Sequence, residues 1–244
     1  MVQSIDRAMQ IIRILESDDG KSGWPISDIS EKVGLPLSTT HRLISSLVEH
    51  DLVAQLAETK RYILGPKWIE LGVRQLDQLD LRTAARPVME RIAAEVKETV
   101  FLSIPNGAFS MGIDKIESPM KLRVVENLGE RIAMNIGAPN KAMLANMDPR
   151  EAEAILIKLI ADKESRNKLL QSLPDIKRAG YCVSYAEMTE GTVAIAAPIL
   201  GFGRRVIGAI GIGVMSYGLT EDRVAYLGKE IVAGAGEVTN KMGG

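Results

Sequence analysis

The chain has few of the residues on which metal-dependent and covalent chemistry rely. Its 244 residues include one cysteine, Cys182, and two histidines, His41 and His50. A single cysteine cannot form an intrachain disulfide, so the fold does not require an oxidising compartment. Because no histidine follows residue 50, the rest of the chain cannot hold a histidine-rich metal site or a histidine-activated nucleophile.

Aromatic residues and net charge are also low. Phe, Trp and Tyr make up 4% of the chain, which argues against base-stacking platforms for single-stranded nucleic acid. The net charge of -1 gives no broad positive field that would attract nucleic acid. Hydrophobic residues (46%) and charged residues (25%) are present in the proportions typical of a folded globular chain. The length allows one large domain or two small ones.

Long hydrophobic runs are absent as well. The most apolar stretch, residues 193–214, is interrupted by Pro198 and by the pair Arg204-Arg205, so we expect a hairpin of two buried strands there. Near the N-terminus, Asp6 and Arg7 interrupt any hydrophobic segment of a signal peptide. We therefore expect a cytoplasmic protein that does not contact a membrane.

The first 66 residues predict three helices followed by a hairpin. An amphipathic helix covers residues 4–16 with Ser4 as its cap, and Ser27 caps a short helix that Gly34 ends. Ser38 caps the third helix, and two short strands with a polar turn follow over residues 52–63. This order is that of a winged helix-turn-helix, although a solvated helix in an unrelated helical domain remains the alternative.

The third helix has a polar side suited to the major groove of DNA. No acidic residue occurs between Lys32 and Val48, and Lys60 and Arg61 at the hairpin tip could contact phosphates. Over residues 1–75, however, nine basic residues face ten acidic ones. We therefore expect non-specific DNA affinity to be modest and sensitive to salt.

The remainder of the chain predicts an α+β domain with grouped strands and helices packed outside them. Two helices come first, over residues 68–79 and 81–96, with a break or first turn at Pro87. The expected strands are 99–104, 111–116, 122–126, 181–185, 192–200 and 205–213, and the expected later helices are 138–147, 149–159, one that ends at 179, and 220–240.

One helix start in this second part is a candidate anion site. Pro139 suits the first helical position, and the backbone N–H groups of Asn140 and Lys141 would then point out of the helix towards a carboxylate. An ordinary helix start is the alternative reading. We expect Cys182 to be a small buried hydrophobic residue rather than a redox sensor.

Several motifs resemble the IclR family of bacterial transcriptional regulators. They are Ser4-Ile5-Asp6-Arg7-Ala8, the run from Gly34 to Leu43, Tyr62-Ile63-Leu64-Gly65, the run from Asn140 to Ala145, and Ala194-Ile195-Ala196-Ala197-Pro198. The resemblance implies a winged helix-turn-helix over residues 1–66, a linker helix over 67–80, and a GAF/PAS-like effector-binding domain with an antiparallel sheet over 81–244. It also implies homodimers or homotetramers, a pseudo-palindromic double-stranded operator, and no catalytic residue, cofactor or metal.

The resemblance assigns residues to DNA contact. The groove-facing candidates and the wing are Ser38, Thr39, His41, Arg42, Ser45, Lys60 and Arg61. Leu37 stands where the family often has a basic residue, so one phosphate contact is expected to be missing. Thr40 stands where an apolar residue is common, so we expect it to pack inside.

The resemblance also places an effector site in the second domain. The positions carried over are Met134, Asn135, Ala138, Pro139, Asn140, Ser184, Glu187, Ala194, Gly211 and Gly213. Members that bind small oxoacids have more polar residues at several of these positions, so we expect a wider, less polar pocket for a larger carboxylic acid. Glu187 either faces that pocket or supports its loop, and the sequence does not decide between the two.

An enzyme or carrier with a helical N-terminal appendage is the competing interpretation. Enzymatic chemistry needs a poised base or nucleophile. Residues 81–244 contain no histidine, one cysteine and no pair of acidic residues at a suggestive spacing. We therefore favour a regulator whose operator binding is modulated by a small carboxylate-like effector.

Overall fold

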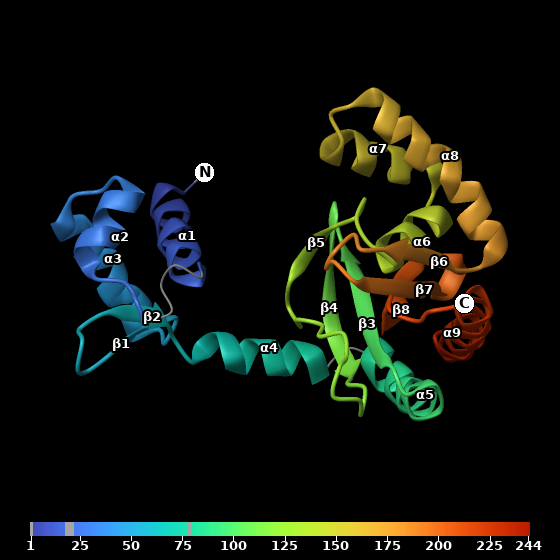
Figure 1. Cartoon of the computed structure of the whole chain (residues 1–244). Helices are drawn as coiled ribbons and strands as arrows, with labels where there is room; N and C mark the ends of the chain where they lie inside the picture. Colours follow the sequence, from blue (N-terminus) through green and yellow to red (C-terminus); the bar gives the residue numbers. More distant parts are fainter. Residues whose placement is uncertain (1, 18–21, 78–79) are drawn as a thin grey trace. The chain divides into compact units, whose positions relative to one another are not determined.

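The computed structural model describes the chain except residues 1, 18–21 and 78–79. It contains two compact units, Met1–Gln78 and Leu79–Gly244 (Figure 1). Each unit has its own hydrophobic core, and we describe each by itself.

The first unit has the element order that the sequence predicts. It consists of α1 (Gln3–Glu16), α2 (Ile26–Val33), α3 (Leu37–Glu49), β1 (Val53–Gln55), β2 (Tyr62–Leu64) and α4 (Lys67–Asp77). Gly34 ends α2 in the left-handed region, with φ of 71°. The strands β1 and β2 pair antiparallel, and a backbone bridge between Trp24 and Tyr62 joins the segment before α2 to this hairpin.

The core of this unit comes from every helix and from the hairpin. Ile11 of α1, Ile29 of α2, Ile44 of α3 and Val53 of β1 are almost completely buried together. Ile5 and Met9, by contrast, are exposed on α1, so the inward face lies along Ile11, Ile12 and Leu15. The packing of α1 against α2 and α3 fixes the direction in which α3 presents its other side.

The predicted caps of the first three helices are wrong. The N-cap residues are Val2, Pro25 and Pro36, none with a side-chain hydrogen bond, so Ser4, Ser27 and Ser38 lie inside the first turns. Pro25 and Pro36 hold extended backbone at the two later helix starts, and their rings preset that conformation without a capping hydroxyl.

The second unit is built on a six-stranded antiparallel sheet in the order β5-β4-β3-β8-β7-β6. The strands are β3 (Thr99–Asn106), β4 (Phe109–Ile116), β5 (Arg131–Ala133), β6 (Cys182–Tyr185), β7 (Thr192–Leu200) and β8 (Val206–Met215). The helices are α5 (Asp80–Val96), α6 (Ala138–Asn146), α7 (Pro149–Leu159), α8 (Lys163–Ala179) and α9 (Glu221–Lys241), and a short turn η2 (Phe202–Arg204) joins β7 to β8.

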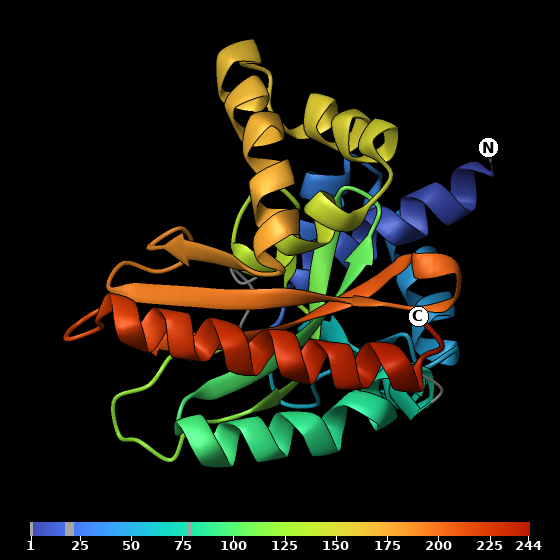
Figure 2. The same cartoon turned by 90° about the vertical axis from the view of Figure 1, so that its right-hand side faces the viewer.

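Helices cover both faces of this sheet. The long helices α5 and α9 lie side by side on one face, and α6 lies on the other face with α7 and α8 beyond it (Figures 1 and 2). Alternate residues of a strand point to opposite faces. Ala194 and Ala196 of β7 accordingly pack with Ala138 and Ala142 of α6.

Two predictions about the fold of this unit are confirmed: it is α+β, and residues 193–214 form an antiparallel hairpin of buried strands. The structure also shows that Asp148 and Thr220 cap α7 and α9 through their side chains. No helix in the described part of the chain is both long and apolar enough to cross a membrane. The described residues also hold no cluster of His, Cys, Asp and Glu that could bind a metal ion.

Two predictions are wrong. Pro87 does not break the chain, because it lies inside the continuous helix α5, whose inward side chains are buried along its length. Residues 122–126 do not form a strand. The side chains of Thr99 and Lys115 donate hydrogen bonds to the carbonyls of Val124 and Glu126, at 2.9 Å each, so these carbonyls need no strand partner. The short strand β5 follows instead.

Candidate functional site

Helix α3 has a buried side and a polar, exposed side. Ile44 and Leu47 are buried, whereas Ser38, His41, Arg42 and Ser45 are exposed and Thr39 is half-buried. The exposed residues recur at positions i, i+3, i+4 and i+7, which places them on one face of the helix. The face carries one formal positive charge, on Arg42, and hydroxyl and imidazole groups that both donate and accept hydrogen bonds.

The residues that flank this face have distinct surroundings. Ser45 Oγ lies 3.4 Å from His41 Nδ1, so these two side chains contact each other on the exposed face. Thr40 is completely buried and its hydroxyl donates to the Pro36 carbonyl at 3.3 Å, which confirms its packing role. Leu37 at the start of the helix is 54% exposed and offers no group to a phosphate.

The hairpin presents the two basic residues predicted for the wing. Lys60 lies in the turn with φ of 57°, and its backbone N–H donates to the Leu56 carbonyl at 2.9 Å. Arg61 is exposed, but its guanidinium also donates to the Gly23 carbonyl at 3.1 Å. Arg61 therefore holds the hairpin against the segment before α2, in addition to offering a charge.

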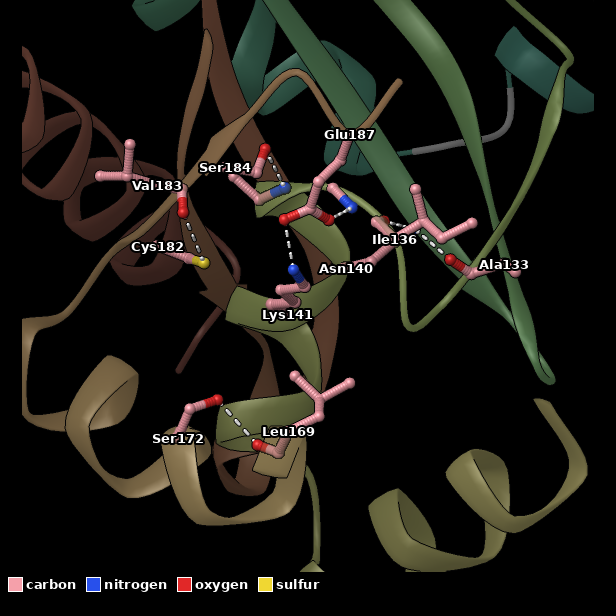
Figure 3. A network of polar contacts seen from close by, with 12 residues as sticks. Ala133, Ile136, Asn140, Lys141, Leu169, Ser172, Cys182, Val183, Ser184 and Glu187 are labelled. Carbon is pink, nitrogen blue, oxygen red and sulfur yellow. Dashed lines mark hydrogen bonds and ion pairs between the residues drawn. The ribbon is translucent and has the colours of Figure 1, made fainter. Parts of the chain in front are cut away.

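In the second unit, the start of α6 is already occupied by side chains of the same chain. Gly137 N–H donates to Glu187 Oε2 at 2.9 Å, and Ala138 N–H donates to Ser184 Oγ at 3.0 Å (Figure 3). Lys141 forms an ion pair with the other oxygen of Glu187. The carboxylate of Glu187 thus lies where the helix dipole favours an anion.

This arrangement corrects one sequence prediction and resolves another. The backbone N–H of Lys141 does not point out of the helix without a partner, because it donates to the Gly137 carbonyl at 3.2 Å. Glu187, whose direction the sequence leaves open, both lines a cavity and supports the helix start. The residue before it, Ala186, has φ of 53°, a left-handed conformation that is strained for a residue with a side chain.

Two adjoining cavities lie beside this helix start, on the α6 side of the sheet. The larger, of about 160 Å³, is lined by Ser184, Glu187, Ala194 and Gly213 and by the segment Val124–Asn127. The smaller, of about 40 Å³, is lined by Pro139 and Asn140 of α6 and by Phe101, Ser103 and Ser110 of the sheet. Glu126, Asn127, Met188 and Ala194 line both.

The structure brings together six of the ten predicted effector positions. Pro139, Asn140, Ser184, Glu187, Ala194 and Gly213 line one or both cavities. The other four positions lie outside these linings. Met134 is fully buried in a separate core cluster, and Ala138, the first residue of α6, is buried in the cluster with Ala142 and Ala196. Asn135 is half-buried in the segment before α6, and Phe101 covers Gly211.

Gly211 and Gly213 do not by themselves widen the pocket. A side chain at Gly211 would meet the Phe101 ring at 2.5 Å, and one at Gly213 would meet Val124 at 2.9 Å. The space that these glycines leave is therefore filled by the chain itself. The lining of the larger cavity includes polar residues, because Glu126, Asn127 and Glu130 come from the segment before β5.

The sequence reasoning missed these residues for a physical reason. The prediction of a strand over residues 122–126 does not identify this segment as a wall of the cavity. The signal that could have revealed it is the density of polar residues directly after that run, Glu126-Asn127 and Glu130. Ser103 and Ser110, which are buried on two sheet strands, were a second signal, because strand interiors rarely hold hydroxyls without a use.

Two groups here have shifted pKa values. Burial raises the pKa of Glu126 to about 6, and the nearby carboxylate of Glu130 adds to this shift while Lys115 opposes it. Burial also raises the pKa of the Cys182 thiol to about 11. Cys182 is 5% exposed, which agrees with the expected role as a small buried hydrophobic residue.

A helix-turn-helix with a hairpin wing, followed by a second unit of a different architecture, defines the class of DNA-binding transcriptional regulators. The family model described as IclR helix-turn-helix domain matches residues 4–57, and the model described as bacterial transcriptional regulator IclR C-terminal matches residues 73–240. The chain belongs to the IclR family of transcriptional regulators.

Individual relatives agree over nearly the full length. The HTH-type transcriptional regulator KipR of Bacillus subtilis is 33% identical over 91% of this chain and 91% of its own length. The HTH-type transcriptional repressor AllR of Escherichia coli K12 is 29% identical over 99% of this chain and 90% of its own. These relatives are regulators, which argues against the enzyme or carrier alternative.

A solved structure has the same fold. It is an IclR homolog from Microbacterium hydrocarbonoxydans, complexed with 4-hydroxybenzoate. It superimposes with a TM-score of 0.79 at 22% identity and covers 98% of this chain and 99% of its own.

Proposed function

We propose that this regulator binds a pseudo-palindromic operator as a homodimer, with the exposed face of α3 in the major groove and the hairpin tip at the phosphates. The observation that carries this proposal is the single face formed by Ser38, His41, Arg42 and Ser45 opposite a buried core. A two-fold dimer presents two such faces, so the half-sites would lie about one helical turn of DNA apart. DNA binding implies action in the cytoplasm.

A gel-shift titration tests the DNA-binding face. The probe is the DNA upstream of the chain's own gene, and the compared proteins are wild type, Arg42→Ala and the control Arg178→Ala. Arg178 is an exposed arginine on α8, in the other unit. We expect Arg42→Ala to lose about 1–3 kcal/mol of operator affinity and Arg178→Ala to bind as wild type. Equal binding by all three would refute the assignment of α3.

We also propose a small carboxylate-like effector that binds beside the start of α6. Support comes from the Glu187 carboxylate, which receives the Gly137 N–H and the Lys141 charge at that point. An effector carboxylate would replace Glu187 there. The larger cavity, of about 160 Å³, has room for a single ring, since an apolar cavity of about 150 Å³ holds benzene. The ligand of the Microbacterium homolog is an acid of this size.

Calorimetric titration of the full chain tests the effector class. We expect benzoate and 4-hydroxybenzoate to bind more tightly than glyoxylate and pyruvate, because the smaller acids leave part of the cavity unfilled. The reverse order would overturn the size argument. An acid that binds must also change operator affinity to count as an effector, because a ligand shifts an equilibrium only by its differential affinity for the two states.

A further inference from the structure

The side-chain oxygen of Asn140 is a buried acceptor without a partner. Asn140 lies in the first turn of α6 and is 2% exposed. Its Nδ2 donates to two carbonyls, those of Ala133 at 3.0 Å and Ile136 at 2.8 Å (Figure 3). Both partners can only accept, so the amide cannot be reversed, and Oδ1 points away from them. Within the described residues Oδ1 accepts no hydrogen bond.

The cavity beside Asn140 offers further acceptors and no cation. Glu126, with its half-buried carboxyl, lines the same space, as do the hydroxyl-bearing residues Ser103 and Ser110. Among the described residues, no lysine or arginine lines either cavity. Lys141, the nearest basic residue of α6, is held by Glu187. A buried acceptor without a partner destabilises the fold, and a donor from a ligand would remove that cost.

We propose that the effector carries, in addition to its carboxylate, an N–H donor group such as an amine or amide, which the side-chain oxygens of Asn140 and Glu126 accept. The inference deepens the proposed function and rests on it for the carboxylate end. Gly137 and Asn140, three positions apart, would receive the two ends of one ligand. Selectivity follows, because a site built to pair a ligand N–H rejects an analogue that lacks it.

The carboxyl of Glu126 should make the affinity for a ligand with an N–H donor depend on pH. Its raised pKa of about 6 reflects burial and Glu130, with Lys115 in opposition, and Glu187 lines the larger, adjoining cavity that Glu126 also lines. An N–H donor binds the ionised carboxylate better than the neutral acid. The advantage of a donor-bearing ligand should therefore grow as the pH rises from 5 to 7.

Matched pairs of ligands test the proposal by calorimetry on the full chain. The pairs are 3- and 4-aminobenzoate against 3- and 4-methylbenzoate, which differ in the donor but hardly in size. In at least one pair, we expect the aminobenzoate to bind 10-fold or more tightly at pH 7 than the methylbenzoate substituted at the same position. The ratio should fall at pH 5 and should drop below 3-fold in Glu126→Gln, but not in the control Glu153→Gln, an exposed residue of α7.

The outcomes separate the two proposals. If the aminobenzoates and the methylbenzoates bind equally, water satisfies the buried acceptors. The proposal of an N–H donor is then overturned, while the proposal of a carboxylate effector stands. If benzamidine, which has donors and no carboxylate, binds and none of the acids does, the carboxylate is overturned and the donor stands. If none of these probes binds at millimolar concentration, both are overturned. A thermal melt of each variant establishes that it is folded.

Discussion

The starts of α3 and α6 differ in what their polar groups contact. At α3 the polar side chains Ser38, Arg42 and Ser45 are exposed, and their place on one face follows from the spacing of residues within the helix itself. At α6 the backbone donors are already paired, with Ser184 and Glu187, which lie 46 and 50 positions away. The first surface is therefore set by local pattern, and the second by the fold of the whole unit.

This contrast predicts that the stability and the DNA binding of α3 depend most on its buried side chains. Ile44 is 1% exposed in the core of the first unit, and Ile44→Ala should cost about 2–5 kcal/mol of unfolding free energy. The operator affinity of Ile44→Ala should fall together with its stability. Both tryptophans, Trp24 and Trp68, lie in this unit, so denaturant unfolding followed by tryptophan fluorescence reports on it alone. The control Val48→Ala, at a partly exposed position, should cost less.

The stability of the start of α6 should depend instead on Glu187, a residue distant in the sequence. Glu187→Ala leaves the Gly137 N–H without its acceptor and Lys141 without its ion pair, and should destabilise the second unit by about 1–2 kcal/mol. Benzoate should bind the variant more tightly, because the internal carboxylate no longer competes. Thermal unfolding by circular dichroism, with and without benzoate, measures both effects. A loss of benzoate binding in this variant would contradict the proposal that the effector carboxylate replaces the carboxylate of Glu187.

A third experiment changes the electrostatics of the cavity. The pKa of Glu126 is about 6 in the fold against 4.5 as the ordinary value, so the folded state disfavours its ionised form. The stability that the neutral form provides is fully present below pH 4.5 and is lost as the pH rises through 6. Glu126→Gln should therefore be more stable than wild type by about 1–2 kcal/mol at pH 8 and similar to it at pH 4. A difference that is constant across this range would argue against the shift.

The smallest expected effect is at the edge of the DNA-binding face. Leu37 is exposed at the start of α3, and Leu37→Arg adds a charge that can contact a phosphate. We expect operator affinity to rise several-fold, and the slope of log affinity against log salt to steepen by about one unit per half-site. Leu37→Gln is the uncharged control. An unchanged slope would place Leu37 away from the DNA backbone.

The two regions also differ in how far the sequence alone describes them. The helix-turn-helix could be predicted, because Gly34, the apolar spacing of α3 and the polar hairpin turn are signals within a few residues of each other. The cavity lining could not, because it depends on which strands become neighbours. Phe101 and Gly211 are 110 positions apart, and only the register of β3 with β8 brings them together. The motif-based positions supplied six lining residues and missed Glu126.

The contact between Phe101 and Gly211 constrains how the chain can diverge. A side chain at 211 collides with the ring at 2.5 Å, so it becomes acceptable only after residue 101 has been replaced by a smaller one. The opposite order of substitutions passes through an overpacked intermediate. Among homologues the two positions should therefore change together, with small residues at 101 wherever 211 is not glycine. Specificity for new effectors would then arise through ordered pairs of mutations rather than single ones.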